Sequence, residues 1–108
     1  MSSPDTLARL EATIAQRLGA DPDSSYVARL HAKGPGKIAQ KLGEEATETV
    51  IAALTETREA LVGEAADLIF HLMVLLAAKQ VPLADVMAEL DRREGVSGIA
   101  EKAARPRD

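Results

Sequence analysis

The chain has 108 residues, enough for one domain with a single hydrophobic core, so we expect one domain over residues 1–108. Seventeen acidic and 13 basic residues give a formal net charge of −4, which argues against nucleic-acid or membrane partners attracted by a broad positive field. The sequence has no cysteine, which excludes disulfides and thiolate metal sites, and no secretory signal at its N-terminus, so we expect a cytoplasmic protein.

The hydrophobic pattern follows the helical period along the chain and never alternates with period two, which predicts an all-α protein. We expect Ser3 to be the N-cap of the first helix, Pro4 to take its first helical position and Gly19 to stop it at the C-terminal end. A turn over residues 21–25 then precedes a short second helix.

The segment KGPGK, residues 33–37, combines two glycines with a proline, which predicts a loop between helices. Its backbone amides can approach a ligand closely, and Lys33 and Lys37 add positive charge beside them. With Arg29 before the loop and Lys41 after it, these are the candidate phosphate-binding residues.

Three further helices are predicted: over residues 37–55, from the segment TETREALVG to about residue 79, and from residue 83 to residue 95. The fourth helix is apolar nearly all round, but its most apolar stretch of about 14 residues is shorter than the roughly 20 of a membrane span. We therefore expect a bundle of about five helices in all, with this helix at its centre. We also expect a homodimer that covers the remaining apolar surface of this helix. Residues 96–108 are expected to form a partly ordered tail.

The third predicted helix carries three acids, Glu44, Glu45 and Glu48, on one face. Such like charges repel each other by a few tenths of a kcal/mol per pair unless solvent or a cation relieves them. A solvated helix face is the simpler explanation of these three residues taken alone.

The fourth predicted helix places Glu64, Asp67 and His71 within about 60° of one another on an otherwise apolar surface. Charged groups in a core cost several kcal/mol unless they are paired or bind a metal. His71 taken alone is more simply a core histidine whose ring nitrogens have partners.

If the third and fourth helices form an antiparallel hairpin, Glu45 and Glu48 face Glu64 and Asp67. Four carboxylates at one point cannot all ionise without a cation. Oxygen ligands of this kind favour Mg²⁺, with Mn²⁺ as a substitute. The sequence therefore predicts a magnesium site that holds phosphates.

Within each pair, Glu45 with Glu48 and Glu64 with Asp67, the two acids are three positions apart, and fifteen residues separate the pairs. This spacing resembles the motif of the MazG-like all-α nucleotide pyrophosphohydrolases. Four segments narrow the resemblance to the phosphoribosyl-ATP pyrophosphatase family: SYVARLHAKG, KIAQKLGEEATETVIAA, EAADLIFHLMVLL and REGVSGIAEKAAR. The resemblance extends over about residues 7–105.

This resemblance implies Mg²⁺-dependent hydrolysis of phosphoribosyl-ATP between its α- and β-phosphates, which yields phosphoribosyl-AMP and pyrophosphate in the second step of histidine biosynthesis. It also implies a homodimer of helical bundles. Many relatives are fused to the next enzyme, a cyclohydrolase, and this chain resembles the stand-alone form, so contact with a separate cyclohydrolase stays open.

Carried over by position, the resemblance implies four metal-binding acids: Glu45, Glu48, Glu64 and Asp67. Glu44 matches a further acid that binds metal or orients water, which makes Glu44, Glu45 and Glu48 the candidate catalytic acids. Lys41 matches the basic position before them. Which acid accepts the proton of the attacking water stays open.

Two other functions are compatible with the sequence: a MazG-like enzyme that clears aberrant (d)NTPs, and a non-catalytic helical dimerisation module. A di-iron bundle is disfavoured because neither histidine follows a glutamate by three positions. Phosphoribosyl-ATP requires a second anionic subsite, for which these basic residues are candidates: Arg29, Lys33, Arg92, Arg93 and Lys102.

Overall fold

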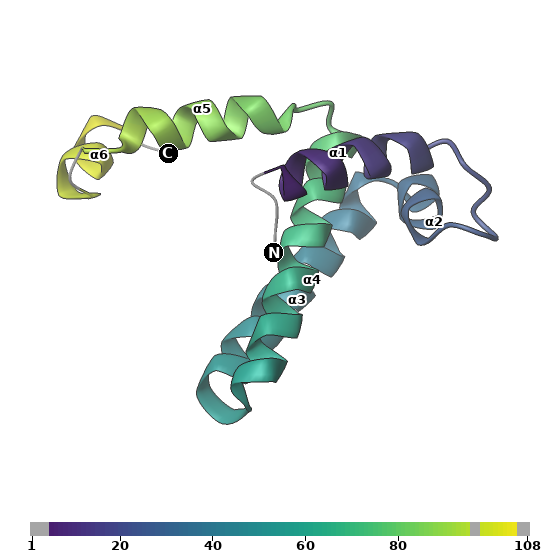
Figure 1. Cartoon of the computed structure of the whole chain (residues 1–108), viewed down its shortest axis with the longest axis horizontal. Coiled ribbons are helices and arrows are strands. Elements are labelled where there is room, and N and C mark those ends of the chain that lie inside the picture. The colour runs from purple at the N-terminus through teal and green to yellow at the C-terminus, as the bar shows by residue number, and fades with distance from the viewer. Residues whose placement is uncertain (1–4, 96–97, 106–108) are drawn as a thin grey trace.

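The structure is a computed structural model that describes residues 5–95 and 98–105. These ranges form six helices: α1 (Thr6–Arg17), α2 (Tyr26–Lys33), α3 (Pro35–Thr55), α4 (Arg58–Ala78), α5 (Leu83–Arg93) and α6 (Gly98–Ala104). They contain no strand, which confirms the all-α prediction (Figure 1). There is one helix more than expected, because α6 lies in the segment predicted to be a partly ordered tail.

Helices α3 and α4 form an antiparallel hairpin that is the longest feature of the molecule (Figure 1). The chain reverses at Glu56 and Thr57, whose backbones are both extended. Thr57 is the N-cap of α4, because its hydroxyl accepts a hydrogen bond from the Ala60 amide at 3.1 Å. This short connection aligns the acids of α3 with those of α4.

The hydrophobic core lies at one end of the hairpin, where α1 and α2 pack across it (Figure 1). Ile38 of α3 and Val74 of α4 are completely buried there. Burying an apolar side chain of this size contributes about 1.5–3 kcal/mol. Every helix from α1 to α5 supplies a buried core residue: Ile14, Val27, Leu30, Ile38, Met73, Val74 and Leu83.

The boundary between α2 and α3 differs from the prediction. Gly34 alone separates the two helices, with φ 93° and ψ 166°, a conformation essentially confined to glycine. Pro35 occupies the first position of α3, where a missing N–H is harmless, so Gly36 and Lys37 already lie in the helix. The prediction that residues 33–37 form a loop is therefore wrong, while phosphate binding by Lys33 and Lys37 stays a prediction.

Helix α1 ends at Arg17, with Leu18 as C-cap donating to the carbonyl of Ile14 at 3.0 Å, so Gly19 directly follows the helix end, as predicted. The predicted N-cap Ser3 and the predicted first helical residue Pro4 lie outside the described residues.

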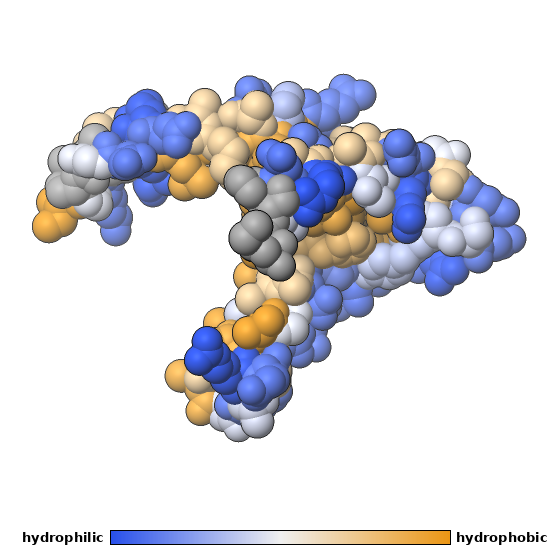
Figure 2. Space-filling view, in the orientation of Figure 1, coloured by the Kyte–Doolittle hydropathy of each residue, from blue (hydrophilic) through white to orange (hydrophobic). Residues whose placement is uncertain are grey.

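Helix α4 is less enclosed than a central bundle helix. Its buried residues are His71, Met73 and Val74, all in its second half. The single chain leaves a set of large apolar side chains of the hairpin exposed, here called the hairpin apolar residues: Val50, Ile51, Leu54, Val62, Ile69 and Leu72. Orange surface on the hairpin is visible in Figure 2. The single chain therefore does not surround α4 with other helices.

By length and composition, α4 is also the one helix among the described residues that could cross a membrane. It is 21 residues long, because the helix continues through polar positions that interrupt the apolar stretch. Core helices of soluble proteins share this length and composition.

Helices α5 and α6 extend away from the hairpin as an arm (Figure 1). The arm is attached at its first residue, where the amide of Leu83 donates to Glu11 Oε2 of α1 at 2.7 Å and the Leu83 side chain enters the core. Among the described residues α5 and α6 make few contacts with the other helices.

Candidate metal centre

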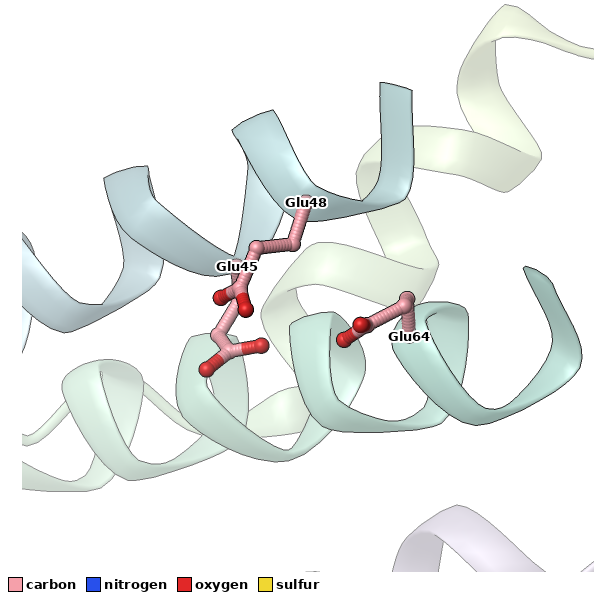
Figure 3. A group of neighbouring side chains, drawn as sticks. All are labelled: Glu45, Glu48 and Glu64. Atoms are coloured by element: carbon pink, nitrogen blue, oxygen red, sulfur yellow. The ribbon is translucent and has the colours of Figure 1, made fainter. Parts of the chain in front are cut away.

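Three of the four predicted metal-binding acids meet across the hairpin (Figure 3). Glu45 and Glu48 come from α3 and point toward Glu64 of α4, and one carboxylate oxygen of each lies within 4.8 Å of the other two. Glu45 is buried, Glu64 is half-buried and Glu48 is exposed. We refer to these three residues as the glutamate trio.

Thr49 joins the two helices beside the glutamate trio. Its hydroxyl lies 2.7 Å from the carbonyl oxygen of Glu45 and 3.2 Å from that of Glu64, so it donates toward α3 and α4 together. A helical threonine commonly bonds the carbonyl four residues earlier, but the second acceptor belongs to the opposite helix. Sequence reasoning missed this residue, and its only signal was a hydroxyl next to Glu48.

Asp67, the fourth predicted ligand, is exposed on α4 and is not part of the glutamate trio. Its charge nevertheless contributes to raising the pKa of both Glu45 and Glu64. Asp67 thus lies close enough to add negative charge to the site.

Crowding and burial disfavour the charged form of two acids in the trio. Burial is the main cause that raises the pKa of Glu45, followed by the charge of Glu48. Burial likewise leads in raising the pKa of Glu64, followed by the charges of Glu48 and Glu45. A group of carboxyls in this condition gains stability by binding protons or a cation.

The donor set of the trio fits Mg²⁺. All the donors are carboxylate oxygens, which a hard divalent ion prefers. One oxygen of each glutamate lies within 4.8 Å of the other two, so the three side chains could hold one ion together. The same oxygens also suit Mn²⁺.

These pKa shifts predict how Mg²⁺ stabilisation depends on pH. A carboxyl whose folded pKa is raised adds stability below its ordinary pKa, and this stability is lost as the pH rises through the folded pKa. Protons and Mg²⁺ compete for the same oxygens, so we expect added Mg²⁺ to raise the melting temperature more at about pH 7.5 than at about pH 5.

Differential scanning calorimetry at both pH values, with and without Mg²⁺, measures this effect. Glu59→Gln, which changes an exposed acid in the first turn of α4, should keep the same pH dependence as the wild type. If Mg²⁺ raised the melting temperature by the same amount at both pH values, this would contradict a metal site that contains Glu45 and Glu64.

Glu44, a predicted catalytic acid, lies outside the trio. Its carboxylate accepts a hydrogen bond from Gln40 at 3.0 Å and pairs with Lys41 at 3.4 Å, and these two contacts lower its pKa. Glu44 and Glu48 share a surface groove of about 610 Å³ whose lining side chains come from α3: Gln40, Gly43, Glu44, Thr47 and Glu48. Of the trio, Glu48 lines this groove.

The predicted phosphate-binding residues are divided between two places. Lys37 and Lys41 lie on α3 near Glu44, and the charge of each lowers the Glu44 pKa. Lys33 is the last residue of α2 and is exposed. Arg29, also on α2, donates to the carbonyl of Pro22 at 3.2 Å, toward the α1–α2 turn.

The other candidates for a second anionic subsite lie on the arm. Arg92 and Arg93 form salt bridges with Glu89 at 2.8 and 2.9 Å, which lower the pKa of that carboxyl to about 2. Lys102 is exposed on α6. In the part of the chain that the structure describes, the arm points away from the hairpin (Figure 1).

His71 is a core histidine with partners at both ring nitrogens, as the simpler explanation predicted. It is 5% exposed, with Nδ1 at 2.7 Å from the carbonyl oxygen of Asp67 and Nε2 at 2.8 Å from the hydroxyl of Tyr26. Sequence reasoning did not foresee the contact with Tyr26, which is 45 positions away.

Comparison with known proteins agrees with this geometry. The family described as Phosphoribosyl-ATP pyrophosphohydrolase matches residues 7–94, which include all four predicted metal-binding acids. The chain belongs to this family. The resemblance predicted from the sequence is thereby confirmed, and the family match runs from α1 to the end of α5.

Curated relatives of the family cover almost the whole chain. A protein of Novosphingobium aromaticivorans named Phosphoribosyl-ATP pyrophosphatase is 71% identical over 105 residues, which are 97% of this chain and 98% of that protein. Proteins with the same name from Rhizorhabdus wittichii and Erythrobacter litoralis are 71% and 72% identical, over 94% of this chain in each case and 96% and 97% of their own lengths.

Proposed function

We propose that the chain hydrolyses phosphoribosyl-ATP to phosphoribosyl-AMP and pyrophosphate, the second step of histidine biosynthesis, at the acids of the α3–α4 hairpin. Membership of the family and the name shared by its relatives support this substrate. The observation that carries the proposed site is the meeting of Glu45, Glu48 and Glu64 within 4.8 Å. A non-catalytic dimerisation module would not need this convergence.

In this proposal the glutamate trio and Asp67 hold Mg²⁺, which supplies positive charge that neutralises the phosphates and polarises the reacting phosphoryl group. Lys37 and Lys41 bind the remaining phosphate oxygens. A water molecule attacks one phosphorus in line with the leaving oxygen, and an acid of the cluster accepts its proton.

Glu44 takes a different part in the proposed reaction. Its lowered pKa makes it a weaker proton acceptor than Glu45 or Glu64, whose pKa values are raised. Its pairing with Lys41 at 3.4 Å suits it to hold that ammonium group beside the phosphates. We therefore assign Glu44 to orienting Lys41.

The proposed substrate predicts selectivity against ordinary nucleotides, since it carries a second phosphoribosyl group on its base and requires a second anionic subsite. With Mg²⁺ we expect rapid pyrophosphate release from phosphoribosyl-ATP and little or none from ATP or dNTPs. Lys33 and Arg29 are the first candidates for this subsite, and each is replaced in turn, as Lys33→Ala and as Arg29→Ala. The variant that removes the subsite should raise KM for phosphoribosyl-ATP by about 10-fold or more.

A coupled pyrophosphate assay on all three substrates measures this selectivity. Lys79→Ala, which changes an exposed lysine at the opposite end of α4 from the turn, is the control and should leave KM unchanged. Comparable turnover of dNTPs, with phosphoribosyl-ATP inert, would instead support the enzyme that clears aberrant nucleotides.

We further propose that the chain is a homodimer formed through the hairpin. Leu54 and Val62 are 78% and 63% exposed, and the other hairpin apolar residues add to this surface. Surface of this kind on a soluble protein usually marks an interface. A second copy, with the same exposed residues, supplies the matching apolar partner of a twofold interface.

The proposed compartment is the cytoplasm, which suits a biosynthetic enzyme and a chain without cysteine. Transient contact with a separate cyclohydrolase, the enzyme that consumes phosphoribosyl-AMP, stays a prediction.

A further inference from the structure

The hydroxyl group of Tyr26 is fixed by a chain of two hydrogen bonds. A backbone carbonyl only accepts, so His71 Nδ1, 2.7 Å from the carbonyl oxygen of Asp67, carries a hydrogen. In the neutral ring Nε2 is then an acceptor, and the Tyr26 hydroxyl 2.8 Å away donates to it. The hydroxyl proton is therefore already used inside the protein.

The ring of Tyr26 is held by two further aromatic contacts. It stacks on Phe70 of α4 with 6.2 Å between the ring centroids and 23° between the planes. His71 meets it edge-on, with the centroids 5.7 Å apart and an angle of 81°. Tyr26 nevertheless remains 43% exposed. The protein thus holds a partly exposed aromatic ring in one orientation.

This ring lies beside the proposed metal centre. Burial is the first cause that raises the pKa of Tyr26, and the next contributions come from the nearby charges of Lys41, Glu45 and Asp67. In turn, Tyr26 is the first cause that raises the pKa of Lys41. The two hydrogen bonds of His71 connect Tyr26 to the backbone of Asp67, so the ring lies near the acids of the proposed centre.

The substrate places a purine next to its phosphates, so a binding site for the base is expected close to the metal centre. Because the Tyr26 hydroxyl donates to His71, the side chain still offers a ligand its ring and, as an acceptor only, the hydroxyl oxygen. The sequence has one Tyr, one Phe and no Trp, and Phe70 is the less exposed of the two. Tyr26 is thus the best-placed ring for the base.

We propose that the ring of Tyr26 is the platform on which the adenine base of phosphoribosyl-ATP stacks, with His71 and Phe70 as positioning residues. This inference rests on the proposed function, since it assumes that the phosphates bind at the glutamate trio. Removing an aromatic platform weakens binding of a stacked base by roughly 5- to 150-fold.

Intrinsic fluorescence tests the platform directly, because the only tyrosine in a chain without tryptophan is Tyr26. Titrating the wild-type protein and Mg²⁺ with phosphoribosyl-AMP should quench the tyrosine emission to saturation. Pyrophosphate, which lacks a base, should bind without quenching. Binding of phosphoribosyl-AMP by calorimetry with no change in emission would overturn the inference while leaving the proposed function intact.

Two variants separate the ring from the hydroxyl. Tyr26→Phe keeps the ring and should bind phosphoribosyl-AMP within about threefold of the wild type, whereas Tyr26→Leu should bind it roughly 5- to 150-fold more weakly. Both variants should keep the wild-type Kd for pyrophosphate with Mg²⁺, which shows that the metal centre is intact.

If Tyr26→Leu bound phosphoribosyl-AMP and pyrophosphate more weakly by the same factor, Tyr26 would only support the fold. If Tyr26→Phe lost as much affinity for phosphoribosyl-AMP as Tyr26→Leu does, the hydroxyl and not the ring would bind the ligand. Either result overturns the platform. If the wild type fails to hydrolyse phosphoribosyl-ATP, the proposed function fails and the platform fails with it. Where Tyr26→Leu does not fold, the wild-type fluorescence titration decides.

Discussion

Replacing Glu48 or Glu64 with glutamine is expected to lower pyrophosphate release from phosphoribosyl-ATP by roughly 100-fold or more. Each amide keeps the shape of the side chain but removes a negative charge that would hold Mg²⁺ in the proposed site. The far-UV circular dichroism of both variants should stay helical, since Glu48 is exposed and Glu64 half-buried. Steady-state kinetics with and without Mg²⁺ measures the loss.

Stability measurements separate loss of the site from loss of the fold. Removing one of several crowded carboxylates relieves repulsion, so the metal-free variants should melt at or above the wild-type temperature. Added Mg²⁺ should raise the melting temperature of the wild type and of the control Glu59→Gln, and leave Glu48→Gln and Glu64→Gln nearly unchanged. Near wild-type activity in both variants would show that the site is assigned to the wrong residues.

Light scattering at micromolar concentration is expected to give a mass of about twice 11.4 kDa. A charge at Leu54 or Val62 should break the dimer, because Leu54→Glu or Val62→Glu would bury an unpaired carboxylate in the interface. In the single chain both side chains are mostly exposed, so neither change should harm the protomer itself. Sedimentation velocity then distinguishes the monomeric variants from the dimeric wild type.

The matched control for the dimer is Gln16→Glu, which places the same charge at an exposed position of α1 and should stay dimeric. A wild-type protein that is fully active and persistently monomeric would refute the homodimer. Dimeric Leu54→Glu and Val62→Glu variants would move the interface away from the hairpin.

The fold class and the proposed metal centre were accessible from the sequence because both depend on local spacing. A period of 3.6 residues defines each helix, and the three-residue spacing of Glu45 and Glu48 puts them on one face in any helix. The short connection after α3 leaves an antiparallel hairpin as the simplest arrangement, which brings Glu64 opposite them.

The loop predicted over residues 33–37 failed because the local pattern admits two structures. Gly36 follows a proline and is equally compatible with a loop and with a first helical turn, and the structure has the helix. The catalytic role expected of Glu44 stays a prediction; Glu44 neighbours Glu45 in the sequence but lies about 100° round the helix, where it contacts Gln40 and Lys41. The partly ordered tail over residues 96–108 also stays a prediction, and α6 lies within that segment.

By itself the sequence determined the all-α class, the family and which acids of α3 and α4 are candidate ligands, since these follow from spacing and residue type. Only the tertiary structure decided that Thr49 bridges α3 and α4, that Tyr26 donates to His71, and that much of α4 stays uncovered in one chain. The physical reason is that helical periodicity specifies which side chains share a face. Which face another helix covers depends on packing between segments far apart in the chain, and no local spacing records it.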